Sequence, residues 1–260
     1  MTQSSVSGSP QDPVVIEVTV AAPIQTVWNY LREPDLIRNW HGWLAEELDS
    51  EIDFIYRRHA RETDIPYVLD IDRGSDDGPD GGWVEGGDRF ELHESERGTT
   101  IRITRGPRGS GEMWDAWYDD ITEGWTSFLG QLRFALEKHP DAARRTALLN
   151  VDGNGLRSVR EALGLSAVAV GEFYVADSGS GLDLRGEGWF VAQHQLGVTV
   201  DSLGPGLVIA ADKPDLNGVS KGAMVIVTTY GQDEQDFART VRQWADWWRA
   251  TYPGAQDPQT

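Results

Sequence analysis

Hydrophobic spacing predicts two long amphipathic helices, each of which follows a run of strand-like segments. Apolar side chains recur at intervals of three and four over residues 115–139 and again over residues 234–252. A proline ends each pattern, at positions 140 and 253. Helices this aromatic need a broad apolar partner, which the preceding strands supply, so a sheet packed on a helix is expected twice. The helical faces are formed by Trp117, Ile121, Trp125, Phe128, Leu132 and Leu136, and by Phe237, Val241, Trp244 and Trp248.

Period-two alternation predicts a hairpin before the first long helix, over residues 88–93 and 99–104. One register places apolar pairs on the core face and an acid–base pair on the other face. That register joins Phe90 to Ile103, Leu92 to Ile101 and Glu91 to Arg102.

Spacing and turn residues predict the remaining elements in the same way. In the first half they are a strand over 14–20, a helix between Pro23 and Pro34, a short helix or turn over 36–40, strands over 52–56 and 67–71, and a loop over 72–82. In the second half they are a helix over 156–163 and strands over 167–176, 189–195, 197–200, 207–211 and 223–229.

These elements divide the chain into two tandem domains of repeated topology, although the halves are not evidently alike residue for residue. The predicted boundaries are a flexible tail over 1–13, a first domain over 14–140, a linker over 141–153, a second domain over 154–253 and a flexible tail over 254–260.

Composition and charge exclude several classes of function. The 260 residues carry a formal net charge of −19 and include no cysteine. Disulfides, thiolate metal sites and cysteine nucleophiles are therefore excluded. An acidic surface repels phosphate polyanions and anionic lipid, so neither nucleic acid nor membrane is expected as a partner. The polar N-terminus lacks a signal-peptide pattern, so a cytoplasmic location is expected.

Motifs of common catalytic and cofactor sites are absent from the sequence. There is no G-x-S-x-G elbow, no H-E-x-x-H, no phosphate-binding G-x-x-x-x-G-K-[ST] and no G-x-G-x-x-G. No cofactor is therefore expected. The acidic segment with Asp70, Asp72, Asp76, Asp77 and Asp80 does not match calcium-loop spacing, and a solvated loop without metal is predicted.

Among five histidines, His41 is the candidate for chemistry, since it stands between Trp40 and Trp43. A general-base or ligand hydrogen-bonding role is one interpretation, and an ordinary surface or half-buried histidine is the other. The other four have simpler interpretations: His59 on a solvated face, His93 on the polar hairpin face, His139 at a helix C-terminus and His194 in a core.

Three segments of the first half resemble a known family. They are A-A-P-I-Q-T-V-W-N-Y-L over 21–31, E-P-D-L-I-R-N-W over 33–40 and E-G-W-T-S-F-L-G-Q-L over 123–132. Together they are similar to the SRPBCC superfamily, also called START-like or Bet v 1-like, and within it to the Hsp90 ATPase activator homologue (AHSA1-like) branch. The resemblance implies an α+β helix-grip fold, in which a curved antiparallel sheet wraps a long C-terminal helix and encloses a cavity. Residues 155–253 look like a divergent, partial version without the opening motif.

The resemblance also implies a ligand site and a choice of functions. In a helix-grip fold the aromatic stripe lines the cavity, although plain core packing is the alternative for each residue. The leading interpretation is a protein that binds a small hydrophobic molecule. The alternatives are a polyketide cyclase or dehydratase-like enzyme, with His41 or Glu91 as its acid–base group, and an Hsp90 co-chaperone-like or other protein-interaction module. The oligomeric state stays open. The expected lining residues are Trp40, Trp43, Trp117, Trp125 and Phe128.

Overall fold

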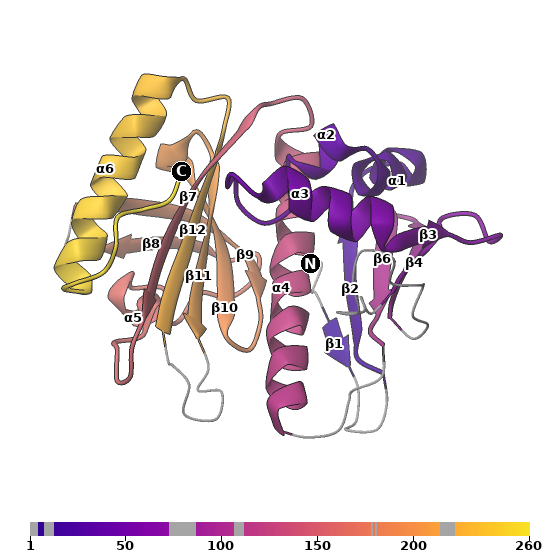
Figure 1. Ribbon diagram of the computed structural model, residues 1–260. Coiled ribbons are helices and arrows are strands. Elements are labelled where there is room, and N and C mark those ends of the chain that lie inside the picture. The colour runs from indigo at the N-terminus through magenta and orange to yellow at the C-terminus, as the bar shows by residue number, and fades with distance from the viewer. Residues whose placement is uncertain are drawn as a thin grey trace. The chain divides into compact units, whose positions relative to one another are not determined.

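The computed structural model describes residues 5–7, 13–72, 87–106, 112–177, 179, 181–213 and 222–260, with side chains omitted for 5–7, 112–120 and 177. It is an α+β protein with two six-stranded antiparallel sheets (Figure 1). The chain divides into two compact units. The N-terminal unit comprises Thr2–His41 and Glu46–Pro140, and the C-terminal unit comprises Gly42–Ala45 and Asp141–Thr260.

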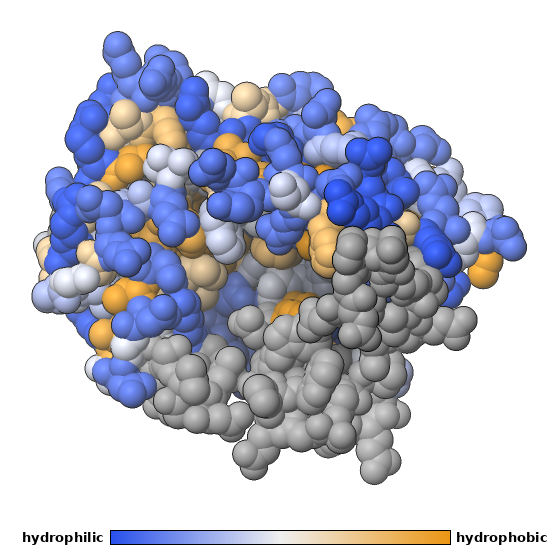
Figure 2. Space-filling model, viewed as in Figure 1, coloured by the Kyte–Doolittle hydropathy of each residue, from blue (hydrophilic) through white to orange (hydrophobic). Residues whose placement is uncertain are grey.

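The surface matches the acidic composition. The face of the molecule in Figure 2 is mostly hydrophilic, with scattered apolar residues. Within the described ranges, no helix combines the length and the apolar character that a membrane span requires. The large apolar side chains that stay exposed are Phe54, Ile65, Phe173, Val175 and Val191.

The N-terminal unit is a sheet in the order β1-β2-β6-β5-β4-β3, with α4 packed along β2. Its strands are β1 (Ser5–Ser7), β2 (Val15–Val20), β3 (Ala60–Glu62), β4 (Val68–Ile71), β5 (Asp88–Ser95) and β6 (Gly98–Thr104). Its helices are α1 (Ile24–Arg32), α2 (Pro34–Ile37), α3 (Leu48–Asp53), the π-helical segment η1 (Phe54–Arg58) and α4 (Glu112–Lys138).

The predicted hairpin register is confirmed in β5 and β6. Phe90 lies opposite Ile103, and Glu91 lies opposite Arg102. Phe90 and Ile103 are fully buried, whereas Glu91 and Arg102 are not. The register could be predicted because a one-residue slip would have moved every apolar side chain to the polar face.

The predicted strand over residues 52–56 is wrong, since this segment is the end of α3 followed by η1. Leu48, Ile52 and Tyr56 are buried, and their spacing of four residues is that of one helical face. Phe54, which completes the apparent alternation, is 51% exposed. The alternation was therefore coincidental, and burial follows the helical period.

The C-terminal unit is a second sheet in the order β7-β12-β11-β10-β9-β8. Its strands are β7 (Arg144–Asp152), β8 (Phe173–Asp177), β9 (Asp183–Val191), β10 (Gln195–Val200), β11 (Gly206–Lys213) and β12 (Gly222–Tyr230). Its helices are α5 (Val159–Ala162), a 3₁₀ turn η2 (Asp201–Leu203) and α6 (Glu234–Thr251).

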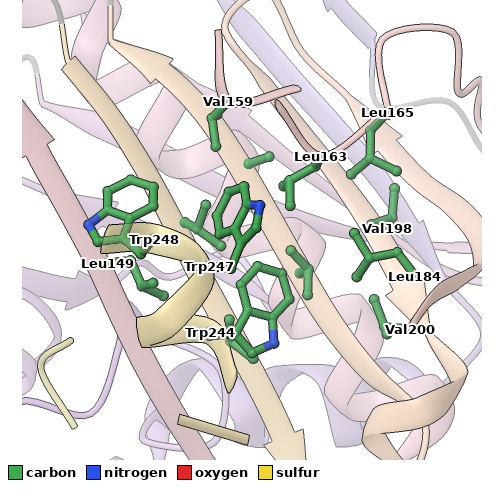
Figure 3. Packing of buried hydrophobic residues seen from close by; sticks show 14 of the residues in the cluster. Leu149, Val159, Leu163, Leu165, Leu184, Val198, Val200, Trp244, Trp247 and Trp248 are labelled. Carbon is green, nitrogen blue, oxygen red and sulfur yellow. The ribbon is translucent and has the colours of Figure 1, made fainter. Parts of the chain in front are cut away.

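Tryptophan side chains of α6 form the centre of the C-terminal core. Trp244, Trp247 and Trp248 are buried, and they belong to one apolar cluster with Leu149 of β7 and Val198 of β10 (Figure 3). Asp233 caps α6, because its carboxylate accepts a hydrogen bond from the backbone N–H of Asp236 at 2.8 Å. The predicted aromatic helix over 234–252 is thus present in the structure.

Three segments expected to be linker or tail form part of the sheets. Residues 144–152 form β7, which pairs with β12, where a linker was predicted. Both faces of β7 bury apolar residues, so the strand shows no period-two signal. Residues 5–7 form the edge strand β1 on β2. The C-terminal tail is held where Gln259 exchanges backbone hydrogen bonds with Leu148, both of 2.9 Å.

The two units share one connectivity. In the N-terminal unit β2 pairs with β6, the last strand before α4. In the C-terminal unit β7 pairs with β12, the last strand before α6. Between these paired strands, each sheet runs as a chain of antiparallel neighbours. The predicted topological repeat is therefore present, and assigning 144–152 to a linker had hidden the first strand of the second copy.

Candidate functional site

His41 is the centre of a buried polar trio in the N-terminal unit. It follows the short helix α2, and its side chain is 0% exposed. Its Nε2 lies 3.2 Å from Oε1 of Glu51 on α3. Its Nδ1 lies 3.0 Å from the hydroxyl of Tyr56 in η1. Both imidazole nitrogens thus face side-chain groups that form hydrogen bonds.

The protonation of the two neighbours assigns a direction to these hydrogen bonds. The hydrogen bond from His41 lowers the pKa of Glu51, so this carboxylate is ionised at neutral pH and can only accept. Burial, with a smaller contribution from the charge of Glu51, raises the pKa of Tyr56 well above 10.0, so this residue stays a phenol. With a neutral imidazole, Tyr56 therefore donates to Nδ1 and Nε2–H donates to Glu51. The Glu51 side chain is 50% exposed, so the trio leads from the interior to solvent.

Aromatic rings surround His41. The ring centroids of Phe128, Tyr56, Trp40 and Trp125 lie 4.5, 5.3, 5.6 and 6.4 Å from that of His41. Trp40 and Tyr56 also meet each other edge to face, with centroids 5.9 Å apart. These rings give the imidazole an apolar environment in which an added hydrogen bond counts for more than in water.

Trp125 is held in this shell by a polar network at the start of β5. Its Nε1 donates to Oδ2 of Asp88 at 2.9 Å. The other oxygen of Asp88 accepts from Nε of Arg105 at 2.8 Å and from the backbone N–H of Gly106 at 3.0 Å. Arg105 also donates to Oγ1 of Thr122 on α4 at 2.7 Å. The network joins α4 to the sheet and fixes the orientation of the indole.

Trp125 connects the sheet to the His41 shell. Its ring packs edge to face on Phe90 of β5, with centroids 5.1 Å apart, and on Phe128 at 6.0 Å. Phe90 is fully buried. An unbroken aromatic path therefore runs from the sheet through two residues of α4 to His41.

The structure brings some of the predicted site residues together and places others elsewhere. Trp40, Trp125 and Phe128 surround His41. Trp43 belongs to the C-terminal unit and is half-buried there. The side chain of Trp117 lies outside the described residues, although its backbone is part of α4.

Glu91 is not a member of the trio. It lies on the face of β5 opposite to the buried Phe90, in register with Arg102, and its Oε1 is 3.7 Å from Nε of Arg89. Its neighbours are therefore guanidinium groups on a partly exposed sheet face.

The acidic residues of the first half have ordinary partners where they are described. Asp70 pairs with Arg89 at 3.2 Å, and Asp72 lies 2.6 Å from Nδ1 of His59. Asp76, Asp77 and Asp80 lie outside the described residues. Across the described ranges, no three histidine, aspartate or glutamate side chains gather in a way that could hold a metal ion.

The sequence-based reasoning missed Glu51 and Tyr56. Reading residues 52–56 as a strand separated them from His41, whereas a helical reading of Leu48, Ile52 and Tyr56 would have put them near one another. The π-helical turn, closed by a 3.1 Å hydrogen bond from the N–H of His59 to the carbonyl of Phe54, was not detectable from the apolar pattern. That turn carries Tyr56, the buried end of the trio.

Comparison with known proteins gives only distant likenesses. No family model matches the chain, and no curated protein matches it. DynU16, a protein of the dynemicin biosynthetic locus, is 16% identical over 93% of this chain and 97% of its own, with a TM-score of 0.30. StfQ, a di-domain ARO/CYC from the steffimycin biosynthetic pathway, is 10% identical over 91% and 96%, with a TM-score of 0.29. Likenesses this distant carry no functional argument, so that argument rests on the site itself.

Proposed function

We propose that the N-terminal unit is a helix-grip domain of the SRPBCC type that binds a small hydrophobic molecule between its sheet and α4. Two independent observations support this. The opening motif over 21–40 and the helix motif over 123–132 resemble that superfamily. The order of one strand, short helices, antiparallel strands and a long helix packed on the sheet is the order that the resemblance implies. Fold alone does not select a ligand, so the ligand class must come from the site.

The observation that carries the proposal is the shell of rings around a hydrogen-bonded imidazole. Trp125 and Phe128 project from α4, the helix that a helix-grip domain wraps, and Trp40 projects from the segment after α2. Aromatic faces bind planar apolar molecules, and a few placed polar groups orient them. Here the polar groups are the Tyr56 hydroxyl and His41. The expected ligand is therefore an aromatic or polyketide-like molecule with a hydroxyl or carbonyl group.

Two related probes test the binding and the role of the polar group. We expect 1-naphthol to bind more tightly than naphthalene in isothermal titration calorimetry, because its hydroxyl can exchange a hydrogen bond with Tyr56. Tyr56→Phe should remove most of that difference, about 1 kcal/mol or fivefold in affinity. It should leave naphthalene binding unchanged.

A matched control separates binding from loss of stability. Tyr174 is also buried, and its hydroxyl donates to the carbonyl of Thr199 at 2.8 Å in the C-terminal unit. Tyr174→Phe removes the same kind of group from a position outside the site and should leave both affinities unchanged. Absence of binding of either probe to the wild type would refute the proposal. An equal preference for 1-naphthol in Tyr56→Phe would refute the role of the hydroxyl.

A second candidate function, an acid–base enzyme of the cyclase or dehydratase type, is favoured by the directed chain of the trio. As a base, the Tyr56 oxygen would accept a substrate proton while its own proton passes to Nδ1 of His41. The resulting imidazolium would be stabilised by Glu51. The reverse transfer would return a proton to the product, so the trio would be regenerated. The co-chaperone-like interpretation stays a prediction of the sequence.

Enolisation of a model diketone tests this second function. 1-Phenylbutane-1,3-dione carries an aromatic ring and an acidic methylene, whose exchange with deuterium in D₂O is followed by proton NMR. If the trio transfers protons, His41→Gln should slow the enzyme-dependent exchange by about 100-fold or more. Glu91→Gln serves as the comparison, since Glu91 lies outside the trio. Exchange that is lost in Glu91→Gln but retained in His41→Gln would move the acid–base role to Glu91.

A further inference from the structure

The chain enters the C-terminal unit between two members of the trio. His41 is the last residue of one segment of the N-terminal unit, and that unit resumes at Glu46, shortly before α3 and Glu51. The intervening residues, Gly42–Ala45, belong to the C-terminal unit. We call these residues the strap. His41 and Glu51 therefore flank a short piece of chain that is held by the other unit.

Two side chains of β7 hold the strap. The backbone N–H of Leu44 donates to Oγ1 of Thr146 at 2.6 Å. The guanidinium of Arg144 donates to the carbonyl oxygen of Gly42. Arg144 and Thr146 stand two residues apart on β7, so they project from the same face of the strand, and both are buried. Burial lowers the pKa of Arg144 to about 10, so its guanidinium stays charged at neutral pH.

The conformation of the strap favours a fixed path over a flexible one. Gly42 has a φ of 51°, a left-handed conformation that glycine adopts without the usual steric penalty. A glycine at this point lets the backbone turn directly after His41. The strap is thus held by a backbone turn at one end and by two side-chain hydrogen bonds from β7.

We propose that Thr146 and Arg144 are positioning residues for the His41–Glu51 hydrogen bond. They contact no member of the trio. They act through the strap, since a displacement of 42–45 is transmitted along the chain to His41 on one side and to α3 on the other. Small displacements matter because a hydrogen bond weakens steeply with distance and angle. The consequence for ligand affinity rests on the proposed function, whereas the effect on His41 does not.

The test removes one hydroxyl from β7 and observes the imidazole of His41. In the wild type we expect a downfield Nε2–H resonance, assigned by long-range proton–nitrogen correlation, because Glu51 accepts this proton. Thr146→Val removes the acceptor of the Leu44 N–H and should abolish that resonance through faster exchange with water. Thr146→Ser restores a hydroxyl and should restore the resonance.

Thr228 offers a matched control. It lies directly opposite Thr146 in the register of β7 and β12, and within the described part of the chain its buried hydroxyl has no hydrogen-bond partner. Thr228→Val makes the same chemical change one strand away and should leave the His41 resonance unchanged. Should Thr146→Val fail to fold by circular dichroism, Thr146→Ala and Thr228→Ala form a second pair with the same expectations.

Two outcomes overturn the proposal. One is an unchanged His41 spectrum in a folded Thr146 variant, and the other is an equal change in the Thr146 and Thr228 variants. Affinity for 1-naphthol, measured on the same samples, should fall about fivefold in Thr146→Val if one hydrogen bond of the site is lost. If the His41 resonance responds as expected but the wild type binds no 1-naphthol, the proposed function fails and the positioning role stands.

Discussion

Substitution of Asp88 by alanine should destabilise the N-terminal unit more than most changes of a single carboxylate. The carboxylate accepts hydrogen bonds from Trp125, Arg105 and Gly106. The Arg105 side chain is only 4% exposed, so its guanidinium depends on Asp88 for compensation of its charge. Removing one partner of a buried ion pair leaves the other charge uncompensated, which costs about 3–5 kcal/mol. Asp88→Asn keeps an acceptor oxygen and should cost less.

The pair of Asp70 and Arg89 provides the comparison within the same sheet. Its N–O distance is 3.2 Å, and both side chains are more than one third exposed. Exposed ion pairs contribute about 0.2–1 kcal/mol, because solvent screens the charges. We therefore expect Asp88→Ala to exceed Asp70→Ala by about 2 kcal/mol or more.

Urea unfolding measured by circular dichroism gives these differences, and hydrogen exchange of peptides from α4 assigns them to the N-terminal unit. Since two units can unfold separately, the local exchange data are needed alongside the global curve. The double variant Asp88→Ala with Arg105→Met removes both charges and should recover part of the loss. The reasoning is refuted if Asp88→Ala costs no more than Asp70→Ala.

Two further predictions concern pH and backbone conformation. The pKa of Glu51 is lowered below its ordinary 4.5 by the hydrogen bond from His41, so ionised Glu51 stabilises the fold above that pH, and this stabilisation is lost as the pH falls through the lowered value. Glu51→Gln should therefore be less stable than wild type at pH 7 in urea unfolding, with a difference that shrinks below pH 4.5; a constant difference would contradict this. Gly98 has a φ of +125°, and an added Cβ would lie 2.2 Å from the carbonyl oxygen of Val20, so Gly98→Ala should lower the thermal midpoint. Gly124 lies in α4 with nothing within 4 Å of an added Cβ, so Gly124→Ala should instead stabilise by about 0.5–1 kcal/mol, and equal signs for the two variants would refute the steric reasoning.

Much of the fold could be predicted from local pattern, because its half-buried elements carry a clear period. β2 alternates between buried and half-buried positions, and α6 buries one aromatic face, so both were visible in the sequence. β7 was not, since Ala147, Leu148 and Leu149 are buried in succession. A strand buried on both faces has no alternation to read, and a short apolar run of this kind does not distinguish strand from other structure.

The candidate site was predictable only as far as its aromatic residues. Trp125 and Phe128 follow from helical spacing, and His41 follows from its place between tryptophans. Glu51 and Tyr56 join His41 through the succession of a short α-helix and a π-helical turn. Neither element has enough residues for a periodic signal, and the contacts span ten and fifteen residues. Such pairings depend on tertiary structure, which a single sequence does not encode locally.

The shared connectivity of the two units indicates why the chemistry is confined to one of them. Between its first strand and the next, the N-terminal unit inserts α1, α2, α3 and η1, and all three members of the trio lie in that insertion or directly beside its helices. At the same point the described C-terminal unit has only α5, whose Ser158 cap, Val159 and Ala162 serve packing and helix termination. The interior of the C-terminal unit is occupied by Trp244, Trp247 and Trp248. A repeat that lacks the polar insertion and fills its interior with indole rings is suited to support, and β7 offers a route for that support through the strap to His41.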